Sequence, residues 1–431
     1  MQPILRLLGI GAVFVLTSIA WLVLGGVTES RTVTQRVRLD ASINELWGRP
    51  QQQQAPSLRF RWRTEEVREE TQTQDGKTKV VRTRAMVEHE KPVSAASSSV
   101  AAALDLDPRL KGLIWYALYD VRFDGRYRYV HDEAEHGALA IEFRFPDAAG
   151  IYDDFTLVVN GVERPEARRP SEGAVRLEVP VAPGDTVEYA VGYRSRGLDA
   201  WVYQPGEGAA SLRDFTMAIT TDFDAIDFAP STMSPSAKAR VGDGWRLDWR
   251  FRQVVTGQGI GLSMPTRIQP GELASALSFS APISLFFFFL VVFVLATLRG
   301  LEIHPVNYLF LGGAFFAFHL LFAYLVDHLA VVPAFAVASV VSIALVTSYL
   351  RLVVSSRFAF VEAALAQLLY LVGFSLAHFF DHFTGLTVTV LSIATLFLLM
   401  QLTGRLRWAE VFTSRRSTAT GGGADAIVGA R

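Results

Sequence analysis

Hydrophobic residues are distributed along the chain in two contrasting patterns. From about Ser275 to Gly404 the sequence is nearly uncharged and apolar, whereas from Thr28 to about Leu273 it is polar and rich in arginine. A helix needs about 20 apolar residues to cross the ~30 Å hydrocarbon core of a bilayer. Six stretches meet this requirement. They are Leu7–Gly26, Ser275–Leu298, Asn307–Val326, Leu329–Leu350, Phe358 to about Phe380, and Thr384 to about Gly404.

This pattern predicts a polytopic α-helical membrane protein with six transmembrane helices, one plus five, and a large domain between the first two. The expected parts are a first helix in residues 1–27, a soluble domain in 28–274, a five-helix domain in 275–412, and a disordered cytoplasmic tail in 413–431. The first stretch could be a cleaved signal peptide. Its apolar run is long for that role and no small-x-small cleavage site follows a shorter one, so we expect an uncleaved anchor.

The placement of arginine predicts the orientation, because short cytoplasmic loops carry an excess of Lys and Arg. Arginines follow the second, fourth and sixth stretches, and the loops after the third and fifth contain no Lys or Arg. Both termini should therefore lie in the cytoplasm and the soluble domain outside it. Arg31, Arg36 and Arg38 oppose this orientation, but large domains translocate largely regardless of charge.

Apolar and polar residues alternate with period two in the soluble domain, which is typical of half-buried strands. Asn160-Gly161 is a strong hairpin signal, and Pro183-Gly184-Asp185 is a turn candidate. Strands in sequence without helical spacers predict an extracytoplasmic antiparallel β-rich, sandwich-like domain. Ala96–Leu106 could be a short helix or a linker. The predicted strands are Arg126–His131, Leu139–Phe145, Asp154–Val159, Ala174–Val181, Thr186–Ser195, Phe215–Thr221 and Trp245–Val255.

Composition removes several classes of function. The net charge of −1 over 431 residues gives no case for a nucleic-acid binder. The absence of cysteine excludes disulfides, thiolate metal sites and a cysteine nucleophile. The sequence also contains no Gly-x-Ser-x-Gly elbow, P-loop or His-Glu-x-x-His motif, which weakens the case for an enzyme without closing it. No cofactor is implied.

Four stretches point to a family. They are "ASINELWGRPQQQQAP" (Ala41–Pro56), "TDFDAIDFAPSTMSP" (Thr221–Pro235) with the strand-rich segment after it, "GLEIHPVNYLFLGGAFFAFHLLFAYLVDH" (Gly300–His328) and "LRWAEVF" (Leu406–Phe412). Together with the one-plus-five layout, they resemble the CreD-like inner membrane proteins. The His-Pro-x-x-Tyr entry into the third span is the most specific of these resemblances.

The resemblance implies a multi-pass protein of the bacterial inner membrane, with a periplasmic domain and a role in envelope integrity and stress. It implies no reaction. At the end of the fifth span the family typically has adjacent acidic residues followed by an aromatic residue, whereas this chain has Asp381-His382-Phe383. The acidic character therefore carries over to Asp381 only.

A cluster of ionisable residues at the predicted outer ends of the third and fifth spans is the candidate metal site. His378 and His382 are four residues apart and share a helical face, and a nearby carboxylate would suit a zinc-type site. Alternatively, the pairs Asp327-His328 and Asp381-His382 simply mark two turns at the lipid–water interface, and His319 and His378 are buried, hydrogen-bonded histidines. The candidate ligands are His319, Asp327, His328, His378, Asp381 and His382.

Four further motifs have simpler interpretations. Glu362 reads as a carboxylate near the inner surface, and His131–His136 as a solvated loop. Asp222, Asp224 and Asp227 read as an acidic turn, since they do not fit the EF-hand pattern. Gly257–Gly261 has no following helix and reads as a strand bulge or turn.

Two functions therefore stay open. In the first, the protein supports cell-envelope integrity or stress tolerance, and its periplasmic domain binds an envelope component or a partner protein. In the second, it is a transporter or membrane enzyme that uses the His/Asp cluster to bind a metal or a proton. Membrane lipids are expected partners, nucleic acid is not, and the sequence does not give the oligomeric state.

Overall fold

A computed structural model of the chain describes residues 3–74, 77–165, 169–206, 210–380 and 384–404. The fold divides into two compact units. The membrane unit contains Met1–Arg38, Gly112–Ile114 and Ile268–Arg431, and the β unit contains Leu39–Lys111 and Trp115–Arg267. Six helical spans are long and apolar enough to cross a membrane, and a large β domain lies between the first two in sequence. The predicted fold class is confirmed.

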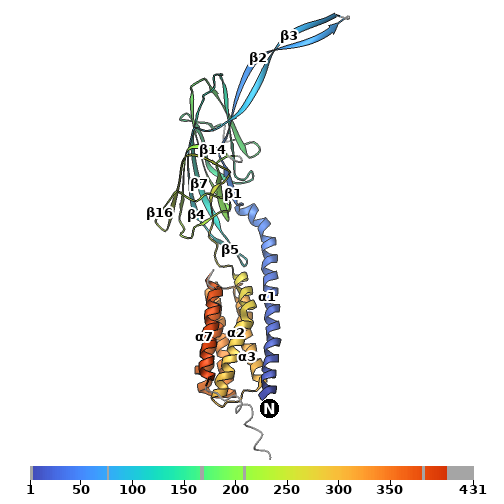
Figure 1. The fold of residues 1–431 in the computed structure, drawn as a ribbon, viewed down its shortest axis with the longest axis vertical. Helices are drawn as coiled ribbons and strands as arrows, with labels where there is room; N and C mark the ends of the chain where they lie inside the picture. The colour runs from blue at the N-terminus through green and yellow to red at the C-terminus, as the bar shows by residue number, and fades with distance from the viewer. Residues whose placement is uncertain (1–2, 75–76, 166–168, 207–209, 381–383, 405–431) are drawn as a thin grey trace, which may run out of the picture. The chain divides into compact units, whose positions relative to one another are not determined.

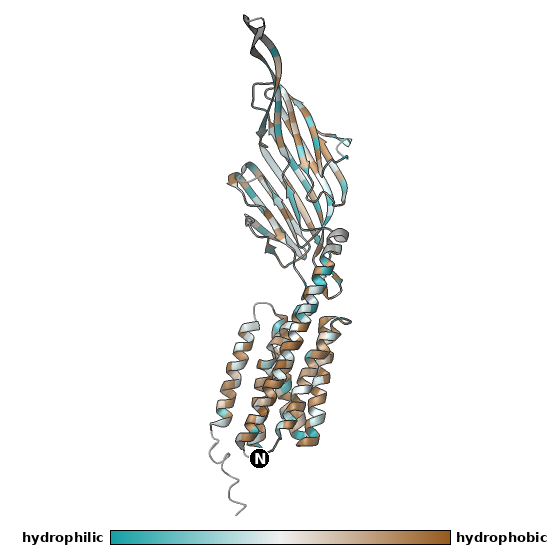
Figure 2. Cartoon of the chain, turned by 90° about the vertical axis from the view of Figure 1, so that its right-hand side faces the viewer, coloured by the Kyte–Doolittle hydropathy of each residue, from teal (hydrophilic) through white to brown (hydrophobic). Residues whose placement is uncertain are grey.

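The helices of the membrane unit lie side by side in Figure 1, and hydrophobic residues dominate them in Figure 2. The first is α1 (Pro3–Trp47), and the next three are α2 (Pro270–Leu298), α3 (Pro305–Leu325) and α4 (Val331–Val353). The fifth span runs through η2 (Phe358–Ala363), α5 (Ala364–Gln367), η3 (Leu368–Gly373), α6 (Phe374–Leu376) and η4 (Ala377–Phe379). The last is α7 (Thr384–Thr403).

Helix α1 is longer than its apolar segment. The hydrophobic stretch ends near Gly26, but the helix continues to Trp47 because no Gly or Pro interrupts residues 28–47. Gly48 then adopts a φ of +97°, which ends the helix, and Pro50 follows. The helix therefore passes the expected boundary after residue 27.

The fifth span is not a regular α-helix. Two π-helical segments, η2 and η3, flank the short α5. Gln367 ends α5 and is completely buried, and its Nε2 donates to Ser342 Oγ at 2.8 Å. Ser342 in turn donates to the carbonyl of Ala314 at 2.7 Å, so three spans are joined by one polar chain.

The largest sheet of the β unit has eight strands in the order β10-β9-β12-β7-β4-β14-β17-β16. All seven predicted strands occur in the β unit. The strands of this sheet are β4 (Ser97–Leu106), β7 (Leu118–Val130), β9 (Tyr152–Val159), β10 (Val162–Glu163), β12 (Thr186–Leu198), β14 (Ala210–Thr221), β16 (Ala237–Val241) and β17 (Gly244–Thr256).

The second sheet has the order β11-β8-β2-β3 and packs against the first through a shared hydrophobic core. It consists of β2 (Ser57–Gln74), β3 (Lys77–Val93), β8 (Gly137–Arg144) and β11 (Ala174–Val181). A third sheet has the order β1-β13-β18-β15, with β1 (Gln51–Gln54), β13 (Ala200–Gln204), β15 (Asp227–Phe228) and β18 (Ile260–Ser263). A separate pair is β5 (Arg109–Lys111) with β6 (Ile114–Tyr116).

Strand β4 corrects one expectation. Ala96–Leu106 was expected to be a short helix or a linker, but it forms a central strand in which Val100, Ala102 and Leu104 are buried at alternate positions. It pairs with β7 in antiparallel and with β14 in parallel orientation. The small residues hid the period-two pattern, because a serine- and alanine-rich segment has little hydrophobic contrast.

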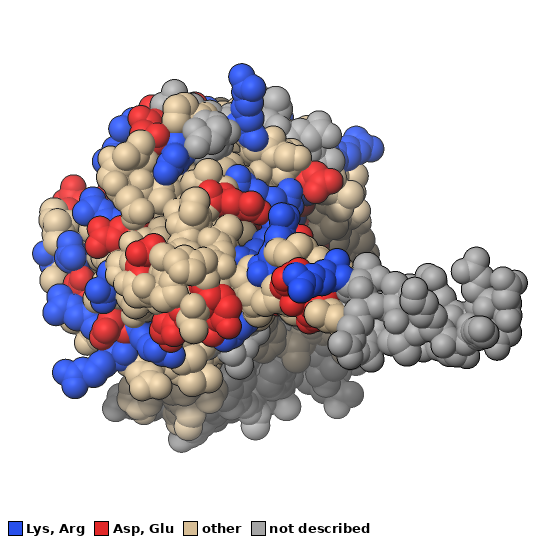
Figure 3. Space-filling view, turned by 90° about the horizontal axis from the view of Figure 1, so that it is seen from above, with Lys and Arg blue, Asp and Glu red and all other residues tan. Residues whose placement is uncertain are grey.

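Strands β2 and β3 form a long hairpin that extends beyond the rest of the β unit (Figure 1). Strand β8 pairs with β2 only between Ser57 and Arg61, so the rest of β2 is paired with β3 alone. Elsewhere the surface carries positive and negative side chains interspersed on the face shown in Figure 3.

Candidate functional site

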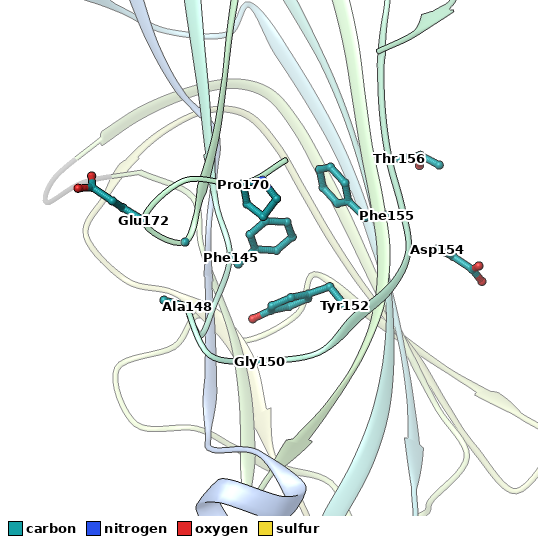
Figure 4. Close-up of a pocket in the computed structure, with 10 residues that line it drawn as sticks. Phe145, Ala148, Gly150, Tyr152, Asp154, Phe155, Thr156, Pro170 and Glu172 are labelled. Carbon is teal, nitrogen blue, oxygen red and sulfur yellow. The ribbon is translucent and has the colours of Figure 1, made fainter. Parts of the chain in front are cut away.

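A pocket of about 990 Å³ lies in the β unit, where the two packed sheets meet at one edge. Its wall is formed by the rings of Phe145, Tyr152, Phe155 and Pro170, which face one another in Figure 4. Phe145 directly follows β8, and Tyr152 and Phe155 lie on β9. The ring centroids of Phe145 lie 4.3 Å from Tyr152 and 5.0 Å from Phe155.

A β-bulge directs Phe155 toward this pocket. Strand β12 pairs Gly192 with Thr156 and Arg194 with Asp153, so the single residue Tyr193 faces both Asp154 and Phe155. Asp154 has a φ of +52°, a conformation that non-glycine residues rarely adopt. Bulges are over-represented at functional sites, where they redirect a side chain. The bulge is therefore a built feature of the pocket.

The hydroxyl of Tyr152 holds the loop at the pocket edge. It accepts a hydrogen bond from the backbone N–H of Asp147 and donates to the carbonyl of the same residue, both at 2.8 Å. Burial raises the pKa of Tyr152 to about 12, so its hydroxyl stays protonated at physiological pH. On the opposite edge Gly173 has a φ of +71°, and a Cβ there would lie 2.7 Å from the Cβ of Ala148.

The acidic residues at the pocket do not give it a free charge. Asp154 and Glu172 point away from the rings in Figure 4. Asp154 lies 3.4 Å from Arg194, and Glu172 lies 4.0 Å from Arg176. Ile151, next to the lining residues in sequence, is 78% exposed. The pocket is thus open and lined by aromatic rings beside polar groups, without a free charge, which suits a ring-shaped group.

The predicted outer-face cluster is only partly brought together. The Asp327 carboxylate pairs with the guanidinium of Arg31 from α1 at 3.0 Å, and that guanidinium also donates to the carbonyl of Ala323 at 3.2 Å. The Arg31 guanidinium also lies 5.5 Å from the centre of the Tyr324 ring. His328 is exposed in the turn after α3. Asp327 therefore serves an interhelical ion pair.

His319 lies on α3, and His378 lies near the end of the fifth span. His319 is buried among aromatic rings, with Trp21 and Phe318 edge-on to it, and its Nδ1 lies 3.2 Å from the Phe315 carbonyl. His378 is half-buried, and its Nδ1 lies 3.3 Å from the Phe374 carbonyl.

Asp381 and His382 lie outside the described residues, as does the Leu406–Phe412 motif. Within the described part of the chain, no group of three or more His, Asp or Glu side chains could hold a metal ion. The metal site stays a prediction.

The remaining motifs have structural partners. His131 was expected in a solvated loop, but it is buried. Its ring nitrogens contact the Tyr129 hydroxyl at 3.1 Å and the Glu135 carbonyl at 2.8 Å. Asp222 accepts a hydrogen bond from the Leu106 N–H, and Asp224 pairs with Arg240. Residues 257–259 lead into β18, which begins at Ile260 and includes Gly261.

Glu362 is the partner of Arg299, which caps the end of α2. The pair joins the second and fifth spans at the end of the bundle where α2 ends. These two residues are 63 positions apart in the chain, so sequence spacing does not indicate the pair.

The His-Pro-x-x-Tyr segment forms a junction between helices. His304 Nδ1 accepts a hydrogen bond from the N–H of Val306 at the start of α3, and Asn307 Oδ1 accepts from the Tyr349 hydroxyl of α4 at 2.9 Å. Tyr308 is completely buried, with its ring edge-on to Phe289 of α2. Pro305 packs against Gly9 of α1, where an added Cβ would lie 3.0 Å from the proline ring. These contacts give the motif an architectural role.

The sequence analysis missed the aromatic pocket. The aromatic residues between Phe143 and Phe155 surround a Gly- and Pro-containing segment, and this density was the available signal. Nothing in the alternation of β9 indicates the bulge that turns Phe155, because the bulge depends on the register with β12.

The described fold defines a multi-pass membrane protein with a β-sandwich-like domain after its first helix. Residues 280–409 match the family described as inner membrane protein CreD, which confirms the resemblance. The match covers most of α2 and the spans that follow, so the membrane unit of this chain is similar to that family.

No curated protein matches the chain in sequence. A solved structure from Legionella pneumophila, described as a proposed nutrient binding protein, is similar over 52% of this chain and 81% of its own chain. The sequence identity is 11% and the TM-score is 0.28, so the likeness supports no conclusion about this chain.

Proposed function

We propose that the protein supports cell-envelope integrity or stress tolerance, and that its β unit lies in the periplasm and binds an envelope component or a partner protein. The aromatic pocket carries this proposal. It is open, its acidic neighbours are paired with arginines, and Ile151 stands exposed beside it. Exposed apolar residues beside such a pocket are typical of binding surfaces.

The proposed orientation rests on the positive-inside rule, with both termini in the cytoplasm. The chain has no cysteine, so a single introduced cysteine reports its own accessibility. Val162 is 57% exposed in the β unit, and Val162→Cys should react with a membrane-impermeant maleimide in cells whose outer membrane has been permeabilised. Labelling only after the inner membrane is lysed would place the β unit in the cytoplasm and contradict the proposed orientation.

Binding through the pocket can be tested by photo-crosslinking in living cells. A photo-reactive phenylalanine analogue at Ile151 should give a discrete adduct with a cell-envelope molecule. The same analogue at Val241, which is 52% exposed at the end of β16, is the matched control. Identical adducts at both positions, or none at Ile151, would reject the pocket as the binding surface.

The cellular role needs a separate test. A deletion strain should show altered envelope permeability, detergent sensitivity or antibiotic sensitivity. Phe155→Ala should restore these properties poorly, whereas Phe251→Ala, at a half-buried phenylalanine on β17, should restore them. A deletion strain without any envelope phenotype would count strongly against the proposed role.

A transporter or membrane enzyme is the second candidate, and the burial of the ionisable His319 and the partial burial of His378 within membrane spans favour it. His378→Ala should then abolish complementation, and His319→Ala should have the same effect. Complementation by both variants would leave the two histidines with a packing role only.

A further inference from the structure

A second cavity in the β unit, of about 440 Å³, has a different chemistry from the aromatic pocket. It lies between the beginning of β2, the end of β8 and the beginning of β14, and so between the two packed sheets. Tyr127 and Tyr189 contribute to its lining, and their rings are stacked 5.1 Å apart. We call this cavity the basic cleft.

Three arginines line the basic cleft: Arg59 from β2, Arg144 from the end of β8, and Arg213 from β14. Glu142 is the single acidic residue among the lining residues. Its carboxylate lies 2.8 Å from Arg144 and 3.3 Å from Arg176, so it is already paired twice.

The wider surroundings of the basic cleft are positive as well. Glu90 pairs with Arg59 and Arg61, and Glu178 pairs with Arg61. Arg176 also lies 4.0 Å from Glu172, so the cleft and its ion pairs contain five arginines and four glutamates, which leaves one positive charge. Arg213 has no acidic partner within 4.0 Å among the described residues, which makes it the cation available to a ligand.

Hydroxyl groups complete the donor set. Ser57, Ser98 and Ser211 line the cleft, and in the described part of the chain their hydroxyls form no hydrogen bond with another residue. A guanidinium and several hydroxyls that converge on one space are all hydrogen-bond donors. Such a set suits an oxyanion with several acceptor oxygens, because charge-assisted hydrogen bonds from arginine to phosphate are strong and can be bidentate.

We propose that the basic cleft binds a phosphate group carried on a larger polar molecule. Arg213 supplies the charge, and Arg59, Arg144 and the serines supply further donors. The cavity is several times larger than a phosphate ion, so the remaining space accommodates the sugar or glycerol that carries the phosphate. This proposal gives the β unit an anionic ligand and does not depend on the aromatic pocket.

The test uses the full chain purified in detergent and titration calorimetry with four small probes. These are inorganic phosphate, glucose 6-phosphate, glycerol 3-phosphate and glucose. We expect both phosphate esters to bind and glucose not to bind. Tighter binding of one ester identifies a sugar phosphate or a lipid-type glycerol phosphate as the source. Inorganic phosphate that binds as tightly as both esters would overturn the proposed larger carrier and identify the free ion as the ligand. Binding of glucose as tight as that of its phosphate would overturn the proposal.

The variant test compares two exposed arginines on neighbouring strands. Arg213→Gln should weaken ester binding by about 10-fold or more, since a hydrogen bond to a charged group contributes about 1.5–3 kcal/mol. Arg250→Gln on β17 is the matched control, because Arg250 is also exposed and does not line the cleft. It should change binding by less than about twofold.

Equal weakening by the two variants would reduce the effect to general surface charge and reject the site. Ser98→Ala is a second test, because this variant removes one hydroxyl from the cleft without changing its charge. It should weaken ester binding without lowering the melting temperature of the chain. Photo-crosslinking at Ile151 is unaffected by either outcome, so failure of this proposal and failure of the proposed function can be told apart.

Discussion

The loop beside the aromatic pocket offers a quantitative test, because one hydroxyl makes two of the hydrogen bonds that hold it. Tyr152→Phe removes the hydroxyl that accepts from the Asp147 N–H and donates to the Asp147 carbonyl, both at 2.8 Å. The aromatic ring and its contacts with Phe145 and Tyr193 remain. The variant therefore isolates two hydrogen bonds from the packing of the pocket.

Each of these hydrogen bonds should contribute about 1 kcal/mol net, so the loop loses about 1–2 kcal/mol of local stability. Since 1.4 kcal/mol corresponds to a tenfold change in an equilibrium constant, the open form should become roughly 5- to 30-fold more populated. Amide hydrogen exchange measures such local opening. Exchange in the peptide that contains Asp147 should accelerate by this factor.

The pH dependence follows from the raised pKa of Tyr152. A tyrosine whose pKa is raised on folding contributes stability below its unfolded pKa, which is near 10, and loses it as the pH rises toward the folded value of about 12. The ratio of exchange rates between variant and parent should therefore be constant from pH 6 to 8.

Tyr189→Phe is the matched control, since the Tyr189 hydroxyl is buried without a hydrogen-bond partner in the described structure. Its removal should leave exchange at Asp147 unchanged and cost little stability. Equal exchange rates in Tyr152→Phe and the parent chain would show that the Tyr152 hydroxyl does not stabilise this loop.

Three further predictions concern stability of the full chain in detergent, followed by thermal or denaturant unfolding. Asp327→Asn should lower the free energy of unfolding by about 1 kcal/mol or less, because the pair with Arg31 is partly exposed. The double variant with Arg31→Gln should lose less than the sum of the two single variants, and a fully additive loss would contradict the pairing. Gln367→Leu should cost about 0.6–1.7 kcal/mol, the range for hydrogen bonds between membrane helices, and a stabilised variant would show that its unpartnered Oε1 outweighs the bond to α4. Desolvation raises the pKa of Asp105 above 3.8, so its ionised carboxylate lowers the stability of the folded chain once the pH exceeds its pKa. Asp105→Asn should therefore stabilise the chain at pH 7 and not at pH 3. Equal effects at the two pH values would show that ionisation of Asp105 does not oppose folding.

The membrane spans and most strands of the large sheet could be predicted because each has its own periodic signal. An apolar run such as Ser275–Leu298 needs no tertiary partner to be recognised. Strands such as β7 and β12 alternate with high contrast, since Phe123, Tyr127 and Tyr193 point into the core. Local pattern and tertiary burial agree at these positions.

What the sequence could not give depends on residues far apart along the chain. The pair of Asp327 with Arg31 joins positions 296 residues apart, and the sequence offered only an interfacial turn or a metal cluster for Asp327. The π-helical segments around Gln367 also escaped prediction, because nothing in the apolar run marks a change of helix type. The basic cleft likewise exists only once β2, β8 and β14 are assembled.

The strand order also constrains how the chain can be made. Strand β1 pairs with β13, and β13 pairs with β18. The first strand to be synthesised therefore cannot complete its sheet until β13 and β18 have been made. Strand β4 similarly waits for β14 across more than 100 residues. Strand β18 ends at Ser263 and α2 begins at Pro270, so synthesis of the second membrane helix starts as the last strand is completed. Non-local pairing of this kind folds slowly and leaves sheet edges open in the meantime. Nascent chains that stop before residue 263 should consequently be targets for chaperones and proteases, and insertion of the later helices must proceed alongside closure of the β domain.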